Sequence, residues 1–483
     1  RVIRRKNEEV LWRGWRRNEG IYQLTAAGTL VIPERVKSGV QLDVTPYALG
    51  GSQKSRGIER DDMFKYGLDL RYGITSNTLL DLTTKTDFAQ VESDRDVINL
   101  SRFSITYPEK RDFFLEGMEN FEFTQYTTML FYSRKIGIDP DTREAIPIRA
   151  GVKLTRKSGG YRLGVLSVQT DSQRDFPETN YSVLRLRKDI FKQSTIGFIG
   201  TNVVNRDRHD SQLYGVDFSL KTDRFMGRSN FLVDGYAAQA VNDGKTRDGF
   251  SGRFNVAWPN DLVESFLLYN TIGKEFDPEI GYIQRTGIQT YIVHVQLHPR
   301  PPIPGVKKLT IQPFDFNDTV ALDGRQLTRI YESRPLGIVF NSGNELTFTI
   351  DDFLEYVDRD FTLFGTATVP RGTYNYTYYT IRYATSKNRA LSASASSRWG
   401  GFYDGDRDQV DVDLTLKSSS HLSLTADMTW NDIAAGSKRF TTREYGGRIQ
   451  YDVSTRLSSS LFAQYNNRTR QVNVNARIHF IPR

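Results

Sequence analysis

The stretch Phe64–Gly73, FKYGLDLRYG, separates into two rows when every second residue is read. The apolar row consists of Phe64, Tyr66, Leu68, Leu70 and Tyr72. The row between them consists of Lys65, Gly67, Asp69, Arg71 and Gly73. Because successive side chains of a strand point to opposite faces of a sheet, this pattern predicts a strand with one apolar face.

The same alternation returns along the chain, for example in residues 78–86, 407–417, 421–431 and 470–480. Segments of roughly ten alternating residues, separated by turn residues, are typical of a transmembrane β-barrel. We therefore predict an all-β fold, an antiparallel barrel of the bacterial outer membrane with about 22 strands that begin near residue 39. Residues 307–322 are predicted to form one of these strands.

The composition fits this fold, although the chain is polar on average. It has 25 Tyr and 29 Phe, but no apolar run approaches the length of a membrane-spanning helix. In a barrel, half of every strand can be polar because it faces a lumen. The alternative is a water-soluble array of β-sandwiches, in which the apolar row would face a core and the polar row would face water.

The charge and the absence of cysteine exclude several kinds of site. Without cysteine there are no disulfides, thiolate metal sites or cysteine nucleophiles. The net charge of +8 is spread among 57 acidic residues, so no nucleic-acid partner is expected. No cofactor is predicted.

The predicted connections alternate between short and long. Short turns are predicted at 74–77, 157–160, 259–261, 341–344, 386–388 and 453–455. Longer loops are predicted at 50–63, 87–145, 171–179, 273–287, 358–371 and 400–406. Outer-membrane barrels have short periplasmic turns and long outer loops, so both termini are expected in the periplasm.

Two segments do not follow the strand pattern. Residues 1–36 do not alternate and are rich in Lys and Arg, with Trp12 and Trp15 among them. This predicts either a periplasmic or plug segment at the membrane interface or a solvated linker, whereas 37–483 is predicted to be the barrel. Residues 87–145 exceed the usual loop length and are dense in aromatic residues and paired charges. We expect this loop to fold inward as a plug, and a cap outside the barrel is the alternative.

The same loop carries a family resemblance. Its residues include Asp87–Asp94, Asn99–Phe103, Tyr107–Gly117 and Phe131–Gly137. Together they resemble the outer-membrane barrel domain of an uncharacterised bacterial family, mostly from Bacteroidetes. The resemblance extends to Glu275–Tyr282, covers most of the first 290 residues, and rests on barrel texture alone in the last 190.

Members of that family typically carry an N-terminal domain that resembles a family-nine carbohydrate-binding module. No such sandwich is found in this sequence, so its glycan-binding role is not carried over. The resemblance therefore implies an outer-membrane location more than it implies an activity.

Plug and lumen residues can be named from the charges and aromatic residues in these segments. On the loop they are Arg102, Glu109, Lys110, Arg111, Phe113, Phe114 and Glu116. On the wall they are Asp69, Arg71, Asp81, Lys85, Arg185 and Arg187. Buried charges are costly unless paired, so we expect these two sets to pair with each other. Their role is either to hold the plug in place or to gate the bore and contact a ligand.

Catalytic and metal sites have little support in the sequence. Only five histidines are present: His209, His294, His298, His421 and His479. None is predicted to be catalytic, and the protein is not expected to be an enzyme. The acidic run Asp404, Asp406 and Asp408 begins like a calcium loop, but Gln409 and Thr415 replace the required Gly and Glu. An exposed acidic loop is the alternative.

The sequence thus predicts a plugged or gated channel or transporter for polar solutes. The alternative is a structural anchor subunit of a surface or secretion assembly. Outer-membrane lipid and lipopolysaccharide are the expected surroundings, and periplasmic or surface proteins are the candidate partners.

Overall fold

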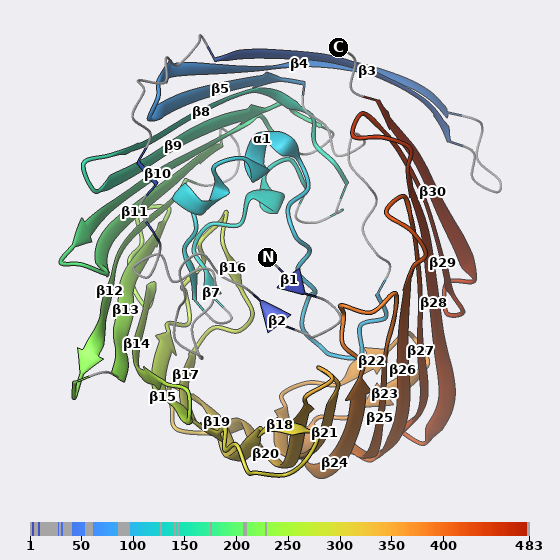
Figure 1. Ribbon diagram of the computed structural model, residues 1–483. Coiled ribbons are helices and arrows are strands. Elements are labelled where there is room, and N and C mark those ends of the chain that lie inside the picture. Colours follow the sequence, from blue (N-terminus) through green and yellow to red (C-terminus); the bar gives the residue numbers. More distant parts are fainter. Residues whose placement is uncertain are drawn as a thin grey trace.

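The computed structural model describes residues 2–3, 8–9, 28, 30–31, 41–53, 61–85, 97–125, 128–139, 142, 144–173, 176–205, 210–227 and 229–480. Within these residues, 23 strand segments form one antiparallel barrel, and Figure 1 shows the sheet curling into a ring. The segments β18 and β19 are separated by Thr310 alone and both pair with β20, so they form one interrupted strand. This confirms the predicted barrel.

The strands pair with their neighbours in chain order. The first are β3 Leu42–Gln53, β4 Asp61–Thr75, β5 Thr78–Thr84, β8 Ile148–Ser158, β9 Tyr161–Thr170, β10 Thr179–Ile190, β11 Ser194–Asn205, β12 Ser211–Phe225, β13 Ser229–Asn242, β14 Phe250–Pro259 and β15 Val263–Ile272. The others are β17 Ile288–Leu297, β18 Val306–Leu309, β19 Ile311–Ala321, β20 Gln326–Phe340, β21 Glu345–Val357, β24 Gly372–Ala384, β25 Leu391–Phe402, β26 Gly405–Lys417, β27 Leu422–Ala435, β28 Lys438–Asp452, β29 Leu457–Asn466 and β30 Gln471–Phe480.

The burial of the two rows is the reverse of that in a water-soluble sandwich. On the outward row, Phe64 is 74% exposed and Val472 is 65% exposed. On the lumen row, Lys153 and Arg185 are among the most deeply buried side chains of the described residues. Large apolar side chains on the outside and charges on the inside suit a wall surrounded by lipid. The soluble-sandwich alternative is therefore excluded.

The two ends of the barrel differ in their connections. At the end where β3 begins, which we call the turn end, β4 and β5 are joined by two residues, and Gly159 and Gly160 join β8 to β9 with positive φ angles of 60° and 74°. At the opposite end, the loop end, the longest connections are 85–147, 273–287 and 358–371.

One predicted loop is absent. Residues 400–406 contain only a two-residue turn, because β25 continues to Phe402 and β26 begins at Gly405. The charged run after Phe402 looked like a solvent loop, but a lumen tolerates charges within a strand.

Residues 97–147, here called the inserted segment, lie inside the ring (Figure 1). Its elements are α1 Asp112–Leu115, the 3₁₀ turns Met118–Asn120 and Ser133–Lys135, β6 Thr124–Gln125 and β7 Thr128–Met129. The strand β7 also pairs with β16 Tyr282–Ile283 from the 273–287 loop, so two loops share one small sheet. A third loop contributes a hairpin of β22 Phe361–Leu363 and β23 Ala367–Val369.

Most of the predicted segment 1–36 lies outside the described residues, as do residues 86–96. The exceptions include β1 Val2–Ile3 and β2 Glu8–Glu9, which pair with each other. Among the helices in the described part of the chain, none has the length and apolarity needed to cross a membrane.

Candidate functional site: the inserted segment and its contacts with the wall

The inserted segment is organised around a buried ion pair. Glu109 and Arg111 lie 2.8 Å apart, and their side chains are 2% and 1% exposed. The Ser133 hydroxyl donates to Glu109 over 2.6 Å, and Arg111 donates to the carbonyls of Ser133 and Ile136. Burial alone would raise the pKa of Glu109, but Arg111 and Ser133 outweigh it and hold the pKa below its ordinary value of 4.5. The pair thus fixes the conformation of the segment from within.

Glycines on the lumen side of the wall receive apolar side chains of the segment. A β-carbon at Gly164 on β9 would lie 2.8 Å from the ring of Phe121, and one at Gly151 on β8 would lie 3.0 Å from Phe113. Both rings are buried in the core that joins the segment to the wall. Distances this short leave no room for a larger residue. The wall is therefore shaped to fit the segment.

Charges of the wall bind the end of helix α1. Lys153 on β8 donates to the carbonyls of Phe113 and Glu116 over 2.5 and 2.7 Å, and it lies 3.2 Å from Asp81 on β5. Arg71 on β4 pairs with Asp81 at 2.7 Å and also with the Glu116 side chain. Three wall strands thus hold the turn that follows the helix.

Arg185 on β10 supports the next part of the segment. It forms a two-pronged ion pair with Asp217 on β12, with distances of 2.6 and 2.9 Å. Its guanidinium also lies over the ring of Phe123, 4.9 Å from the centroid. Phe123 in turn packs edge-on against Tyr236 of β13. A charge buried in this way is fully paired, as its depth requires.

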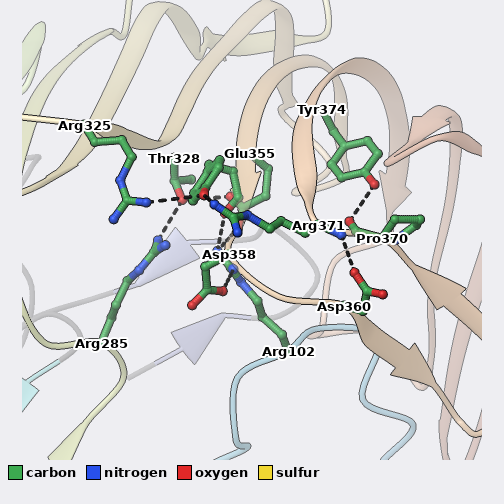
Figure 2. A network of polar contacts seen from close by, with 11 residues as sticks. Arg102, Arg285, Arg325, Thr328, Glu355, Asp358, Asp360, Pro370, Arg371 and Tyr374 are labelled. Atoms are coloured by element: carbon green, nitrogen blue, oxygen red, sulfur yellow. Dashed lines mark hydrogen bonds and ion pairs between the residues drawn. The ribbon is translucent and has the colours of Figure 1, made fainter.

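A polar network at the loop end ties the start of the segment to the far wall (Figure 2). Arg102 donates to Glu355 over 2.5 Å, to Asp358 over 3.0 Å and to the carbonyl of Tyr356 over 3.0 Å. Thr328 donates to the same Glu355 carboxylate over 2.8 Å. Nearby, the Ile98 amide donates to Glu444 of β28 over 2.9 Å. These contacts connect the segment to strands on the side of the barrel opposite α1.

Two spaces remain beside the segment. A cavity of about 830 Å³ lies at the loop end between the segment and the 273–287 loop, and Tyr107, Tyr132 and Tyr282 help to line it. A second cavity of about 640 Å³ lies against the wall from β15 to β25, where Glu332, Asp351 and Arg398 are among the lining residues. Both volumes are in the range that small ligands occupy.

Several predicted residues lie elsewhere or act differently. Lys85 does not line the lumen: its amine lies 2.7 Å from the Tyr66 hydroxyl, on the outward row. The strand ends at Thr84, and Lys85 has a positive φ of 57°, so the alternation stops there; the prediction is corrected. Asp69 accepts a hydrogen bond from Thr83 within the wall, and Lys110 donates its backbone amide to Glu109. Arg187 lines a cavity beneath Phe123.

The acidic run does not form a calcium loop in this structure. Asp404 accepts a hydrogen bond from the Gly436 amide in the turn, and Asp406, on strand β26, pairs with Arg439 at 3.5 Å. A strand does not curl its side chains around one ion. In the part of the chain that the structure describes, no group of three or more His, Asp or Glu residues could hold a metal.

The histidines contribute to packing. His294 on β17 lies 2.7 Å from the Asp315 carboxylate of β19 and stacks on Phe266 at 4.9 Å between ring centroids. His421 contacts the carbonyl of Asp452 at the turn end. His209 lies outside the described residues.

Sequence reasoning missed Lys153, Asp217, Glu355 and the wall glycines. The alternation places Lys153 on the lumen row, opposite Val152, so its face could have been predicted. Its partners could not, because they come from a loop.

The family comparison covers almost the whole chain. A family model described as a domain of unknown function (DUF5916) matches residues 38–162 and 166–482. The chain belongs to this family. The match includes the last 190 residues, which the sequence motifs had linked to a family only through barrel texture. It does not bear on an N-terminal sandwich.

Comparison with solved structures gives remote likenesses. One is the translocation pore of the P pilus usher PapC, with a TM-score of 0.35 and 11% identity over 92% of this chain and 97% of that chain. Another is a mutant of the ferric enterobactin receptor PfeA from Pseudomonas aeruginosa, with a TM-score of 0.41 and 10% identity over 89% of this chain and 75% of that chain. No curated protein matches the chain.

Proposed function

We propose that the protein is a plugged outer-membrane barrel that acts as a gated channel or transporter for polar solutes. The observation that carries this proposal is the asymmetry of the lumen. The inserted segment packs against β5–β15, while the wall from β15 to β25 lines an open cavity with charges of both signs. A mixed polar lining suits the passage of hydrated solutes. In this proposal the segment is the plug.

The arrangement of the connections supports an orientation. The barrel strands begin and end at the turn end, which has the short connections. Because barrels of this kind have short turns on the periplasmic side, we place both ends of the barrel there. The 830 Å³ cavity and the Arg102 network then face the outside, where a solute would arrive. Lipid and lipopolysaccharide would surround the outward row, and no catalytic activity is expected.

The Arg102 network is the contact that most simply controls opening. It joins the segment to β21 through one side chain, whereas the contacts on the other side of the lumen are many. Loss of this contact would free the start of the segment while α1 stays bound to β5 and β8. Gating by a loop that detaches at one side needs no unfolding of the barrel.

Conductance across planar bilayers tests the proposal. The wild type, Arg102→Gln, and a chain in which residues 97–147 are replaced by a short Gly/Ser linker would be compared. We expect little conductance from the wild type, intermittent openings from Arg102→Gln, and a large steady conductance from the deletion. If the deleted form folds but conducts no better than the wild type, the plugged-channel proposal fails.

A structural anchor is the second candidate function. The buried Glu109–Arg111 pair and the seat of Lys153 make the segment an integral part of the core, which a permanently closed barrel would also show. Such a barrel would hold periplasmic or surface proteins. Absence of conductance from all three forms, together with stoichiometric protein partners in mild detergent extracts, would favour this candidate.

A further inference from the structure

Four guanidinium groups meet at the loop end of the barrel, and they come from four separate elements. Arg102 belongs to the inserted segment and Arg285 to the 273–287 loop. Arg325 lies in the turn between β19 and β20, and Arg371 directly precedes β24. Figure 2 shows these four side chains converging on the end of β21.

Only Arg102 is bound by carboxylates at hydrogen-bond distance. Arg285 donates to the Thr328 hydroxyl over 3.1 Å. Arg325 and Arg371 both donate to the hydroxyl oxygen of Tyr356, each over 3.3 Å. The nearest carboxylate to Arg325, that of Asp323, is 4.0 Å away. Within the described part of the chain, neither Arg285 nor Arg371 has a carboxylate at ion-pair distance.

The geometry leaves positive charge without an anionic partner. The nitrogens of Arg325 and Arg371 that share the Tyr356 oxygen lie at most about twice the hydrogen-bond distance apart. Burial, together with the charge of Arg102, lowers the pKa of Arg285. Glu355 and Asp358 are already engaged by Arg102. An anion with several oxygens could accept from these guanidiniums at once and would relieve their repulsion.

We propose that Arg285, Arg325 and Arg371 form a binding site for an oxyanion of the phosphate class at the loop end of the barrel. The phosphate group belongs either to a solute that reaches the mouth or to the headgroup of a surrounding lipid. Bound there, it would join the 273–287 loop, the β19–β20 turn and the start of β24. The site does not depend on whether the bore conducts.

Binding measured on the full chain in detergent and in lipid nanodiscs tests this proposal. In detergent the probe is inorganic phosphate; in nanodiscs it is diphosphoryl lipid A, with a phosphate-free glycolipid as the reference. The test variant is Arg325→Gln/Arg371→Gln. The control is Arg329→Gln, because Arg329 already donates to Asp318 and Gln326 over 3.1 and 2.9 Å at the same end of the barrel.

We expect the wild type and the control to bind alike and the double variant to bind about tenfold or more weakly, as loss of charge-assisted hydrogen bonds predicts. Binding of inorganic phosphate assigns the site to solutes, and binding of the phosphorylated lipid alone assigns it to a headgroup. The single variant Arg285→Gln should weaken binding independently. Heat-modifiable migration on gels shows that each variant is folded.

Two results would overturn the proposal. One is that the folded wild type binds neither probe. The other is that the folded double variant binds as tightly as the wild type. Because conductance plays no part in this measurement, its outcome is separate from that of the plugged-channel proposal.

Discussion

The wall that carries the inserted segment, β5–β15, and the wall of β24–β30 have the same alternation but different lumen faces. On the first wall, Lys153 and Arg185 are almost fully buried beneath the segment. On the second, even the lumen row of β30 is mostly exposed, including Arg477. A polar inward row is therefore compatible either with a packed core or with open water. What distinguishes them is whether the row fits another part of the chain.

The way each wall satisfies its charges shows this difference. On the second wall the polar side chains bind one another across neighbouring strands: Arg407 donates to Asn431 over 3.0 Å, and Thr429 donates to Asp411 over 2.9 Å. On the first wall Lys153 binds backbone carbonyls of the segment instead. Such a charge needs the segment, whereas the charges of the second wall do not.

Replacing residues 97–147 by a short linker is the strongest test of this comparison. We expect the second wall to be unaffected, because its polar pairs lie within the sheet. The first wall should become solvent-exposed at β8–β13. Hydrogen–deuterium exchange of the two walls in detergent measures both effects. Equal loss of protection on both sides would show that the walls are not independent.

Replacing Lys153 by Met should cost about 3 kcal/mol of stability, because two carbonyls and Asp81 lose a buried cationic partner. The free energy of unfolding in urea, with the protein in detergent, measures this. The matched control is Arg477→Gln on β30, for which we expect a change within about 0.5 kcal/mol since the residue is exposed. A similar loss in both variants would contradict the distinction between the walls.

Replacing Gly164 by Ala should destabilise the protein by about 1–2 kcal/mol, because the new methyl group would overlap the ring of Phe121. Gly447→Ala is the control: a β-carbon there would have its nearest neighbour at 3.9 Å, an ordinary contact. The same urea titration measures both. If Gly164→Ala is neutral, the glycine seats do not shape the wall.

Acid should loosen the inserted segment only at low pH. The pKa of Glu109 is lower in the folded protein than its ordinary value of 4.5, so its ion pair stabilises the segment above that value and is lost as the pH falls through the folded pKa. Protease cleavage within residues 97–147 should stay slow between pH 8 and 5, where tested at about these values, and rise below pH 4. In Glu109→Gln, cleavage should be fast at every pH.

The local pattern predicted the wall but not what fills it. The face of Asp81, Arg185 and Lys153 follows from alternation, and so do the strands and short turns. The prediction that Lys85 lines the lumen fails because the strand ends one residue earlier. The predicted loop at 400–406 is a tight turn because charged residues that look solvent-exposed can lie inside a barrel.

The sequence by itself determined a lipid-facing barrel, because alternation along a strand needs only neighbouring residues, and it named the loop residues that bind inside. Only the tertiary structure decided which wall the loop covers, that Lys153 binds its carbonyls, and that three arginines meet at the loop end without carboxylate partners. Those contacts join residues hundreds of positions apart, such as Arg102 and Glu355. Their pairing depends on how a closed sheet brings distant strands together across one lumen.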